Sequence, residues 1–399
     1  MRIHFISGSL LPSMEASAVN VMRTCDALAR EGHKVTVFAR RNGTDDVAAV
    51  LRQYGVTGDV RLVLLGPPAP PRDLWIRKED RFDRNFRYPL QVLQALRGMP
   101  APDLIYGRHL YSMALASLFM PDIPMMFELH QVRSSGMGRL LERWLFQRPA
   151  FIGAAVISEA LIADYRRLYA GLDRLELFLV RNGAEWPTGE VTPANLGGRP
   201  GVRKIGYVGS LFPGKGMETV AALARRLPEM DFHVVGGTAT DIGEWRRRAP
   251  GAGNMHFHGF VESARVPAYL ASMDVLLAPP RVQVNPMTGR GFGRWESPLK
   301  IFQYMAAGKP IIASDLPIVR EILTDGSTAL LAPAEDMDAW VGALRRLEDP
   351  ALAQRLATSA RTEVERRFSW RAKARAIEGV YRHRRPQIPA SGSTLEDSA

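Results

Sequence analysis

The sequence predicts an α/β protein made of two Rossmann-like domains with parallel sheets. At 399 residues, the chain is long enough for two domains that each bury a core of their own. An apolar run at residues 3–7 is followed by a helical pattern at about 17–31 and a second apolar run at 35–38. This strand–helix–strand order is typical of a parallel sheet. The same order begins again at residue 204, after a stretch rich in glycine and proline at 186–202.

Composition and charge limit the classes of function. The chain is 46% hydrophobic and 23% charged, as ordinary soluble proteins are, and its apolar runs are too short for a membrane-spanning helix. The first residues run directly into a strand without a signal-peptide pattern, and the single cysteine, Cys25, is expected to be a small buried side chain, so we expect a cytoplasmic protein. The net charge of +11 indicates an anionic partner. Nucleic acid is disfavoured because no zinc-finger, helix-turn-helix or aromatic RNA-binding pattern is present.

Residues 296–315 carry the most informative pattern. Ser297 is expected to cap a helix whose first residue is Pro298, and Gly308 is expected to end it before a buried strand. A Ser-Pro-x-Lys helix start brings backbone N–H groups, the positive end of the helix dipole and Lys300 to one place, which suits a phosphate. The alternative is an ordinary capped helix.

The run Ser-Pro-Leu-Lys-Ile-Phe-Gln-Tyr-Met-Ala-Ala-Gly-Lys-Pro at 297–310 resembles the donor-binding signature of family-4-like glycosyltransferases. The resemblance implies the GT-B fold, in which two Rossmann-like domains face a central cleft. It also implies transfer of a hexose-type sugar, with retention of configuration, from a nucleotide-diphosphate donor. The motif regions contain no Asp-x-Asp metal clamp, so we expect no metal and no cofactor apart from the nucleotide-sugar co-substrate.

The resemblance assigns the donor to the C-terminal half. The loop at 209–216 is similar to a family loop whose arginine and lysine hold the donor diphosphate; Lys215 is retained, but Ser210 replaces the arginine. Gln303 stands where many members have a ribose-binding glutamate, and Trp295 stands where they have a sugar-binding one. We therefore expect Lys300 to supply the missing positive charge. The expected donor-binding residues are Gly209, Ser210, Lys215, Gly237, Phe260, Val261, Ser297, Pro298, Leu299, Lys300 and Gln303.

The acceptor is assigned to the N-terminal half. Glu128 and His130 are two residues apart at the end of a predicted strand, so their side chains lie on the same side. By resemblance His130 lies near the transferred sugar. The expected catalytic residues are His130, Glu128 and Lys215. The expected acceptor-binding residues are Ser13, Ala16 and Ser17, in the loop at 7–18, and Arg108, which follows a predicted strand.

Three further features bear on partners. Basic residues alternate with apolar ones at 72–97 and at 139–148, a pattern that fits an anionic membrane surface or a solvated arginine face on a core-facing helix. His256 and His258 alternate in a strand, but with no third ligand nearby we expect them to pack rather than to bind zinc.

The expected domains are residues 1–185, a linker at 186–202, and residues 203–367, with a helix at 368–385 that returns to the first domain by resemblance. A disordered tail is expected at 386–399.

The predicted function is a glycosyltransferase acting on a glycan, lipid-linked or small-molecule acceptor, in cell-envelope or polysaccharide biosynthesis, and peripheral to the inner membrane face. Two alternatives stay open. One is a sugar-nucleotide epimerase of the same fold, and the other is a catalytically weakened nucleotide-sugar-binding protein.

Overall fold

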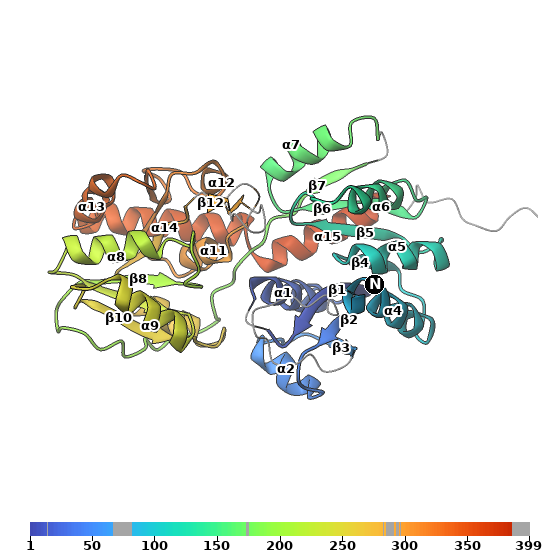
Figure 1. Ribbon diagram of the computed structural model, residues 1–399, viewed down its shortest axis with the longest axis horizontal. Helices are drawn as coiled ribbons and strands as arrows, with labels where there is room; N and C mark the ends of the chain where they lie inside the picture. Colours follow the sequence, from blue (N-terminus) through green and yellow to red (C-terminus); the bar gives the residue numbers. More distant parts are fainter. Residues whose placement is uncertain are drawn as a thin grey trace, which may run out of the picture. The chain divides into compact units, whose positions relative to one another are not determined.

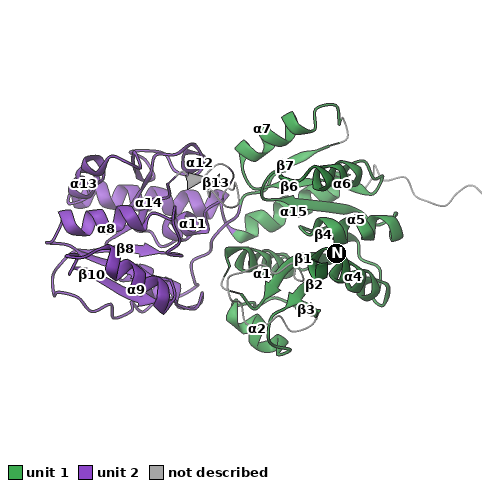
Figure 2. Cartoon of the chain, in the orientation of Figure 1, with its two compact units in different colours: residues 1–181, 370–399 green, residues 182–369 purple. Residues whose placement is uncertain are grey.

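A computed structural model describes residues 1–13, 15–66, 82–172, 175–281, 283–284, 291–292, 295 and 297–384 of the chain. It divides into two compact units (Figure 2). Unit 1 comprises residues 1–181 and 370–399, and unit 2 comprises residues 182–369. The last helix therefore belongs to the first unit, and the divisions fall at 181/182 and 369/370. The first part of the predicted basic amphipathic segment, residues 72–81, and the predicted tail at 386–399 lie outside the described residues.

Unit 1 contains a seven-stranded sheet in the order β3-β2-β1-β4-β5-β6-β7, with every pairing parallel (Figure 1). Its strands are β1 (Arg2–Leu11), β2 (Lys34–Arg41), β3 (Val60–Leu65), β4 (Leu104–Gly107), β5 (Met125–Leu129), β6 (Phe151–Val156) and β7 (Leu177–Leu179). Its helices are α1 (Ala16–Arg30), α2 (Val47–Gln53), the π-helical turn η1 (Asp83–Arg87), α4 (Tyr88–Arg97), α5 (Leu110–Phe119), α6 (Gly136–Phe146), α7 (Glu159–Leu168) and α15 (Trp370–Arg384).

The central strands of unit 1 are buried on both faces, which explains their continuous apolar sequences. Every residue of β4 and β5 is buried. Cys25 on α1 is also fully buried, as expected. The first strand, however, is longer than predicted. It continues to Leu11 because, after a shift of register beyond Ile6, Leu10 and Leu11 pair with the end of β2.

Unit 2 contains a six-stranded parallel sheet in the order β10-β9-β8-β11-β14-β15. Its strands are β8 (Lys204–Val208), β9 (Asp231–Val235), β10 (Met255–Gly259), β11 (Val275–Ala278), β14 (Ile311–Ser314) and β15 (Leu330–Ala332), and β12 (Gln283–Val284) and β13 (Gly291–Phe292) form a separate antiparallel pair. Its helices are α8 (Met217–Arg226), α9 (Ala239–Arg248), α10 (Val266–Ala271), α11 (Leu299–Ala306), α12 (Pro317–Arg320), α13 (Met337–Arg346) and α14 (Pro350–Arg367).

Two core clusters cover the two faces of the sheet in unit 2. One is formed with α10, α11 and part of α14, and includes Phe302 and Phe368. The other is formed with α8, α9 and α13, and includes Trp245 and Trp340. A parallel sheet with helices on both faces is the doubly wound arrangement that the sequence predicts.

The predicted start of α11 is wrong by one residue. Pro298, expected at the first helical position, has an extended backbone (φ −72°, ψ 104°) and is the N-cap, so the helix begins at Leu299. Ser297, expected as the cap, makes no side-chain cap hydrogen bond; its carbonyl instead accepts a hydrogen bond from Asn182 at 3.3 Å.

A buried ion pair joins α15 to the sheet of unit 1. Lys373 Nζ lies 3.3 Å from Glu128 Oε1, and both side chains are about 1% exposed. Glu128 is on β5, so a contact between residues 245 positions apart fixes the last helix against the central sheet. Removing one member of such a pair leaves a buried charge without a counter-ion.

We expect Lys373→Met to lower the free energy of unfolding of unit 1 by about 3–5 kcal/mol, because the Glu128 carboxylate would stay buried without its ion-pair partner. Adding Glu128→Gln should recover much of this loss, since the charge is then removed. The control is Arg371→Ala on the same helix. Arg371 is 63% exposed and pairs with Glu31, so its loss should lower the free energy by less than about 1 kcal/mol. Equal effects at both positions in chemical denaturation would contradict the buried-pair interpretation.

Candidate functional site

The functional residues predicted from sequence follow the carboxyl ends of the central strands. In each sheet the strand order reverses beside the first strand, between β1 and β4 in unit 1 and between β8 and β11 in unit 2. Loops diverge at such a point and leave room for a ligand. Gly209, Gly237 and Phe260 follow β8, β9 and β10, and Arg108 and His130 follow β4 and β5.

Tyr207, a fully buried residue of β8, fixes the loop at 209–216. Its hydroxyl is 2.7 Å from the carbonyl oxygen of Ser210 and 3.1 Å from that of Lys215, and it donates to them. Burial raises the pKa of Tyr207 well above its ordinary value, so the hydroxyl keeps the proton it donates. The two hydrogen bonds bind both ends of the loop to the sheet.

The same tyrosine positions Lys300. The ammonium nitrogen lies 4.0 Å from the centre of the Tyr207 ring, a cation–π contact. One turn further along α11, the Tyr304 hydroxyl accepts from Val208 N at 2.8 Å and donates to Val208 O at 3.2 Å. Helix α11 is thereby anchored to the end of β8, with Lys300 directed at the loop.

Close backbone approaches explain the glycines. A Cβ atom on Gly209 would lie 2.8 Å from Lys300 Nζ, and one on Gly236 would lie 2.0 Å from the carbonyl oxygen of Gly209. A side chain at either position would separate the two loops or displace the ammonium group. Gly237, with φ +78°, is similarly close to Leu211.

Arg281, after β11, is a second anchor for this loop. Its backbone N–H donates to Gly214 O at 3.1 Å, and its Nε donates to Thr219 Oγ1 at 3.3 Å. A guanidinium nitrogen also lies 3.4 Å from Glu335. The residue therefore has structural partners on several sides.

The other predicted donor residues lie around this centre with different exposure. Lys215, Gln303 and Leu299 are half-buried, Phe260 is 49% exposed, and Val261 packs against the core. Glu296 lies outside the described residues. The structure thus brings Gly209, Ser210, Lys215 and Lys300 together around Tyr207.

In unit 1, Glu128 is the centre of a buried polar cluster. It accepts a hydrogen bond from the Tyr106 hydroxyl, pairs with Lys373, and lies 2.5 Å from His130 Nε2. Burial alone would raise the pKa of this carboxyl, but Lys373, His130 and Arg108 hold it well below the usual range. Glu128 is therefore a carboxylate that positions His130.

The protonation state of His130 follows from this contact. Burial and the charge of Arg108 lower the pKa of His130 to about 4, so the imidazole is neutral near pH 7. Because a carboxylate only accepts, His130 Nε2 carries the proton and Nδ1 remains an acceptor. A neutral imidazole of this tautomer can accept a hydrogen bond from a hydroxyl group.

The predicted acceptor residues surround the start of α1. Arg108 lies with a guanidinium nitrogen 3.5 Å from the carbonyl oxygen of Ser17, and Ala16 is the exposed first residue of the helix. The backbone of Ser13 is held on both its N–H and its carbonyl by the Tyr54 hydroxyl, each at 2.7 Å. Ser13, Ala16 and Ser17 lie just after the end of β1. Because β1 continues to Leu11 and α1 begins at Ala16, the loop between them is shorter than the predicted loop at 7–18.

Sequence reasoning missed Tyr207, Arg281, Tyr106 and Lys373. Tyr207 and Tyr106 resemble ordinary apolar strand residues, and Lys373 lies in an arginine-rich helix, so the local signal for these residues is weak. A polar hydroxyl in an otherwise apolar strand was the one available indication, because a buried hydroxyl requires a partner.

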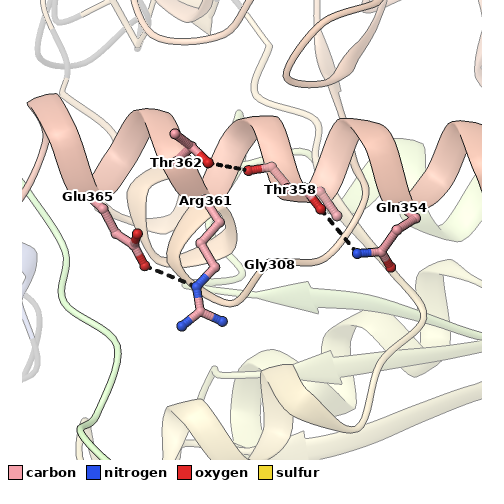
Figure 3. Close-up of a pocket in the computed structure, with 7 residues that line it drawn as sticks. Gly308, Gln354, Thr358, Arg361, Thr362 and Glu365 are labelled. Atoms are coloured by element: carbon pink, nitrogen blue, oxygen red, sulfur yellow. Dashed lines mark hydrogen bonds and ion pairs between the residues drawn. The ribbon is translucent and has the colours of Figure 1, made fainter.

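A depression on α14 contains none of the predicted site residues (Figure 3). Its polar side chains bond to one another: Arg361 donates to Glu365 at 3.0 Å, and Gln354 donates to Thr358 at 3.1 Å. We therefore do not assign the site there.

The basic amphipathic segment at 139–148 overlaps α6. Met137 and Leu140 are 73% and 62% exposed on that helix, whereas Glu142 is buried against Arg133, Tyr165 and Tyr169. Part of the apolar face is thus exposed rather than core-facing. None of the helices in the described part of the chain combines the length and hydropathy of a transmembrane segment.

Two family models match the chain. The model "Glycosyl transferase 4-like domain" matches residues 16–183, and the model "Glycosyl transferases group 1" matches residues 202–349. Together they cover most of both units.

Three curated relatives are similar in sequence. Phosphatidyl-myo-inositol mannosyltransferase of Mycolicibacterium smegmatis is 33% identical over 42% of this chain and 42% of its own length. Glycogen synthase of Mycobacterium tuberculosis is 27% identical over 72% of this chain and 70% of its own length. Lipopolysaccharide core biosynthesis mannosyltransferase LpsB of Rhizobium meliloti is 28% identical over 80% and 88%. The chain thus spans less than half of the first relative's length.

Solved structures share the fold of the whole chain. Sucrose-phosphate synthase of Thermosynechococcus elongatus has a TM-score of 0.72 at 19% identity, covering 96% of this chain and 98% of that one. Anabaena Alr3699/HepE in complex with UDP-glucose has a TM-score of 0.67 at 17% identity, covering 96% and 100%. The predicted GT-B fold is confirmed.

The neutral state of His130 predicts a pH dependence of stability. Because the pKa of His130 is about 4 in the folded protein and has the ordinary histidine value of 6.5 in the unfolded chain, the unfolded chain binds more protons between these values. We therefore expect the His130 contribution to be fully present above pH 6.5 and to be lost as the pH falls to 4. In calorimetry, His130→Asn should make the decline of the melting temperature between pH 6.5 and 4 shallower. Above pH 7 the two slopes should agree; an unchanged slope at lower pH would rule out a neutral buried His130.

Proposed function

The chain belongs to the family-4-like glycosyltransferases of the GT-B fold, and on that premise we propose that it is a retaining hexosyltransferase. Its donor is a nucleotide-diphosphate sugar held by unit 2, and its acceptor is bound by unit 1. The observation that carries the proposal is the Lys300 ammonium, held on the Tyr207 ring beside the backbone of Gly209. This is a fixed positive charge at the edge of the sheet where ligands bind.

A pyrophosphate fits these groups chemically. Its negative charges would meet Lys300 and Lys215, and the N–H groups of Leu299 and Lys300, in the first turn of α11, would donate to its oxygens. Gly209 and Gly237 present backbone without side chains, which allows a close approach. Catalysis then consists mainly of stabilising the charge that develops on the departing diphosphate.

We propose that the reaction needs no metal ion, because the two lysines supply the positive charge. Lys300 offsets the replacement of the expected arginine by Ser210. Arg281 is a weaker candidate for supplying this positive charge, since its guanidinium group contacts Thr219 and Glu335. Gln303 would accept from a ribose hydroxyl without the added strength of a charged acceptor.

His130 is proposed to orient the transferred sugar. Its Nε2–H is directed to Glu128, so Nδ1 can accept a hydrogen bond from a sugar hydroxyl. Glu128 acts through His130 and is a positioning residue. Arg108, Ser13, Ala16 and Ser17 would contact the acceptor from the neighbouring strand ends.

A lipid-linked or envelope-glycan acceptor is the class we favour. Met137 and Leu140 are exposed on α6 beside Arg139 and Arg143, which suits an anionic membrane surface. The mannosyltransferase relatives named for phosphatidyl-myo-inositol and for the lipopolysaccharide core support the same class. The protein would then work at the inner face of the membrane as a peripheral protein.

The replacement of the donor-loop arginine by Ser210 favours one alternative, a binding protein with weakened catalysis. The two functions differ in turnover: a binding protein would be stabilised by a donor without consuming it. Product analysis with labelled donor and a lipid extract distinguishes them, and also reports any epimerised donor.

For Lys215→Ala we expect transfer to fall by about 10²–10³-fold, because one of the two charges facing the diphosphate is lost. The donor is first chosen by thermal-shift screening of UDP-, GDP-, ADP- and dTDP-sugars. The matched control is Lys204→Ala, which removes the same charge at the opposite end of β8. The melting temperatures of both variants should stay near that of the parent. Full activity of Lys215→Ala would refute the assigned donor site.

For Tyr207→Phe we expect kcat/KM for the donor to fall by about 5–30-fold, from the loss of one hydroxyl proton shared between two carbonyl oxygens, worth about 1–2 kcal/mol in total. The phenyl ring still supports Lys300, so activity should not vanish. Tyr111→Phe in α5, which removes a hydroxyl from unit 1, is the control. If both variants match the parent, the hydroxyl does not organise the loop.

A further inference from the structure

A cluster of one aspartate and three histidines lies on one face of the sheet in unit 2. Asp231 and His233 are two residues apart on β9, and His256 and His258 are two residues apart on the edge strand β10. His256 pairs directly with His233 in the register of the two strands. Alternate residues of a strand share a face, so the pairing brings four polar side chains together.

The ligand atoms of Asp231, His233 and His256 lie within 4.8 Å of one another. The imidazoles of His233 and His256 stack with ring centres 4.8 Å apart, and His256 Nε2 is 3.7 Å from Asp231 Oδ1. The sequence-based expectation that no third ligand is near His256 is therefore wrong.

His233 provides a second, independent indication of a ligand. Its side chain is fully buried, yet its Nε2 has no hydrogen-bond partner among the described residues. The other nitrogen, Nδ1, is 3.1 Å from His258 Nε2. When Nδ1 donates to His258, the lone pair of Nε2 is directed into the cluster, which is how histidine ligands of metals are commonly oriented.

The electrostatics suit a neutral-imidazole and carboxylate ligand set. Burial, with the neighbouring histidines, lowers the pKa of His233 to about 4, so it is deprotonated near pH 7. Burial alone would raise the pKa of Asp231, but the hydrogen bonds from Arg199 lower it. Metal ligands must be in these forms.

Arg199 is the competitor of a metal ion at this place. Its Nε lies 2.9 Å from Asp231 Oδ1, and its backbone N–H donates to Oδ2 at 2.8 Å. A terminal guanidinium nitrogen also donates to Asp231 Oδ1 at 2.7 Å and to the carbonyl oxygens of Pro228 and Met230 at 2.9 and 3.2 Å. A metal ion must displace these side-chain hydrogen bonds; the side chain is 49% exposed, so water can solvate the released guanidinium while the backbone contact remains. The preceding Gly198, with φ +90°, lets the chain close over the cluster, because a Cβ atom there would lie 2.8 Å from Asp231 Oδ2.

We propose that Asp231, His233 and His256 form a structural site for Zn²⁺ or a similar divalent transition metal, with water as the fourth ligand and His258 as the orienting partner. In a tetrahedral zinc site the ligand atoms are about 3.3 Å apart. The ligand atoms of this cluster lie within 4.8 Å of one another, so they must approach by roughly 1.5 Å at most to bind zinc. His256, with 30% of its side chain exposed on an edge strand, can make this movement. The metal joins β9 to β10.

The site is separate from the proposed donor site. Asp231 is the first residue of β9 and His256 the second of β10, whereas the donor loops follow the carboxyl ends of these strands. The metal therefore stabilises unit 2 without taking part in transfer, and it is compatible with metal-independent catalysis.

The test uses the full-length protein, freed of metal with EDTA and dialysed. With Co²⁺ we expect one equivalent to bind, with visible d–d absorption that Zn²⁺ abolishes. A hundredfold excess of Zn²⁺ over Kd should raise the melting temperature by about 5 °C. Mg²⁺, which prefers oxygen ligands, should do neither. Absence of stoichiometric Co²⁺ and Zn²⁺ binding would overturn the proposal and leave the cluster as stacked, packed histidines.

Three variants sharpen the result. His256→Phe keeps the stacked ring but removes the ligand nitrogen, and should weaken Zn²⁺ binding by at least about 100-fold; His256→Gln replaces it if the first fails to fold. Arg199→Gln removes the competing cation and should tighten binding and enlarge the rise in melting temperature. His383→Phe in α15, an exposed histidine of unit 1, is the control. Unchanged affinity in both His256→Phe and Arg199→Gln would assign the metal to another place.

Discussion

The donor half of the molecule depends on the partners of a single buried phenol. Tyr207 is enclosed in a parallel strand, so its hydroxyl must find acceptors inside the protein. It finds them in the carbonyls of Ser210 and Lys215, while its ring supports Lys300. The position of the loop at 209–216, which we propose binds the donor diphosphate, is thereby set by the core of the sheet rather than by the loop itself. Loops held in this way lose little entropy when a ligand binds.

Unit 1 follows the same physical principle with a charge in place of a phenol. Glu128 is buried in β5, and its carboxylate selects the tautomer of His130 while Lys373 balances its charge. In both units, the side chains that would touch substrate are oriented by a strand residue that substrate never reaches. Preorganisation of this kind maintains the geometry of a site without a bound metal or cofactor.

Secondary-structure elements that depend on a local sequence pattern could be predicted. Contacts that depend on the register of paired strands, or on the return of the last helix to unit 1, could not. The predicted strand that carries Glu128 is confirmed as β5 (Met125–Leu129), because a mostly apolar run is typical of a buried parallel strand. The start of α11 was misplaced because Pro298 is compatible with both an extended cap and a first helical turn, and only the surrounding contacts decide. Asp231 and His256 are 25 residues apart, so their proximity follows from the pairing of β9 with β10. Lys373 could not be assigned to Glu128, because nothing local connects positions separated by 245 residues.

That separation has a consequence during synthesis. Glu128 leaves the ribosome long before Lys373, with all of unit 2 translated in between. At about 5–20 residues per second, the 245 intervening residues take roughly 12–50 s. During that time the first sheet has its acidic group but not the helix that neutralises it. Unit 2 can fold as its residues emerge, whereas unit 1 reaches its final state only after α15 has been translated. The half of the protein that is made first is thus the half that matures last.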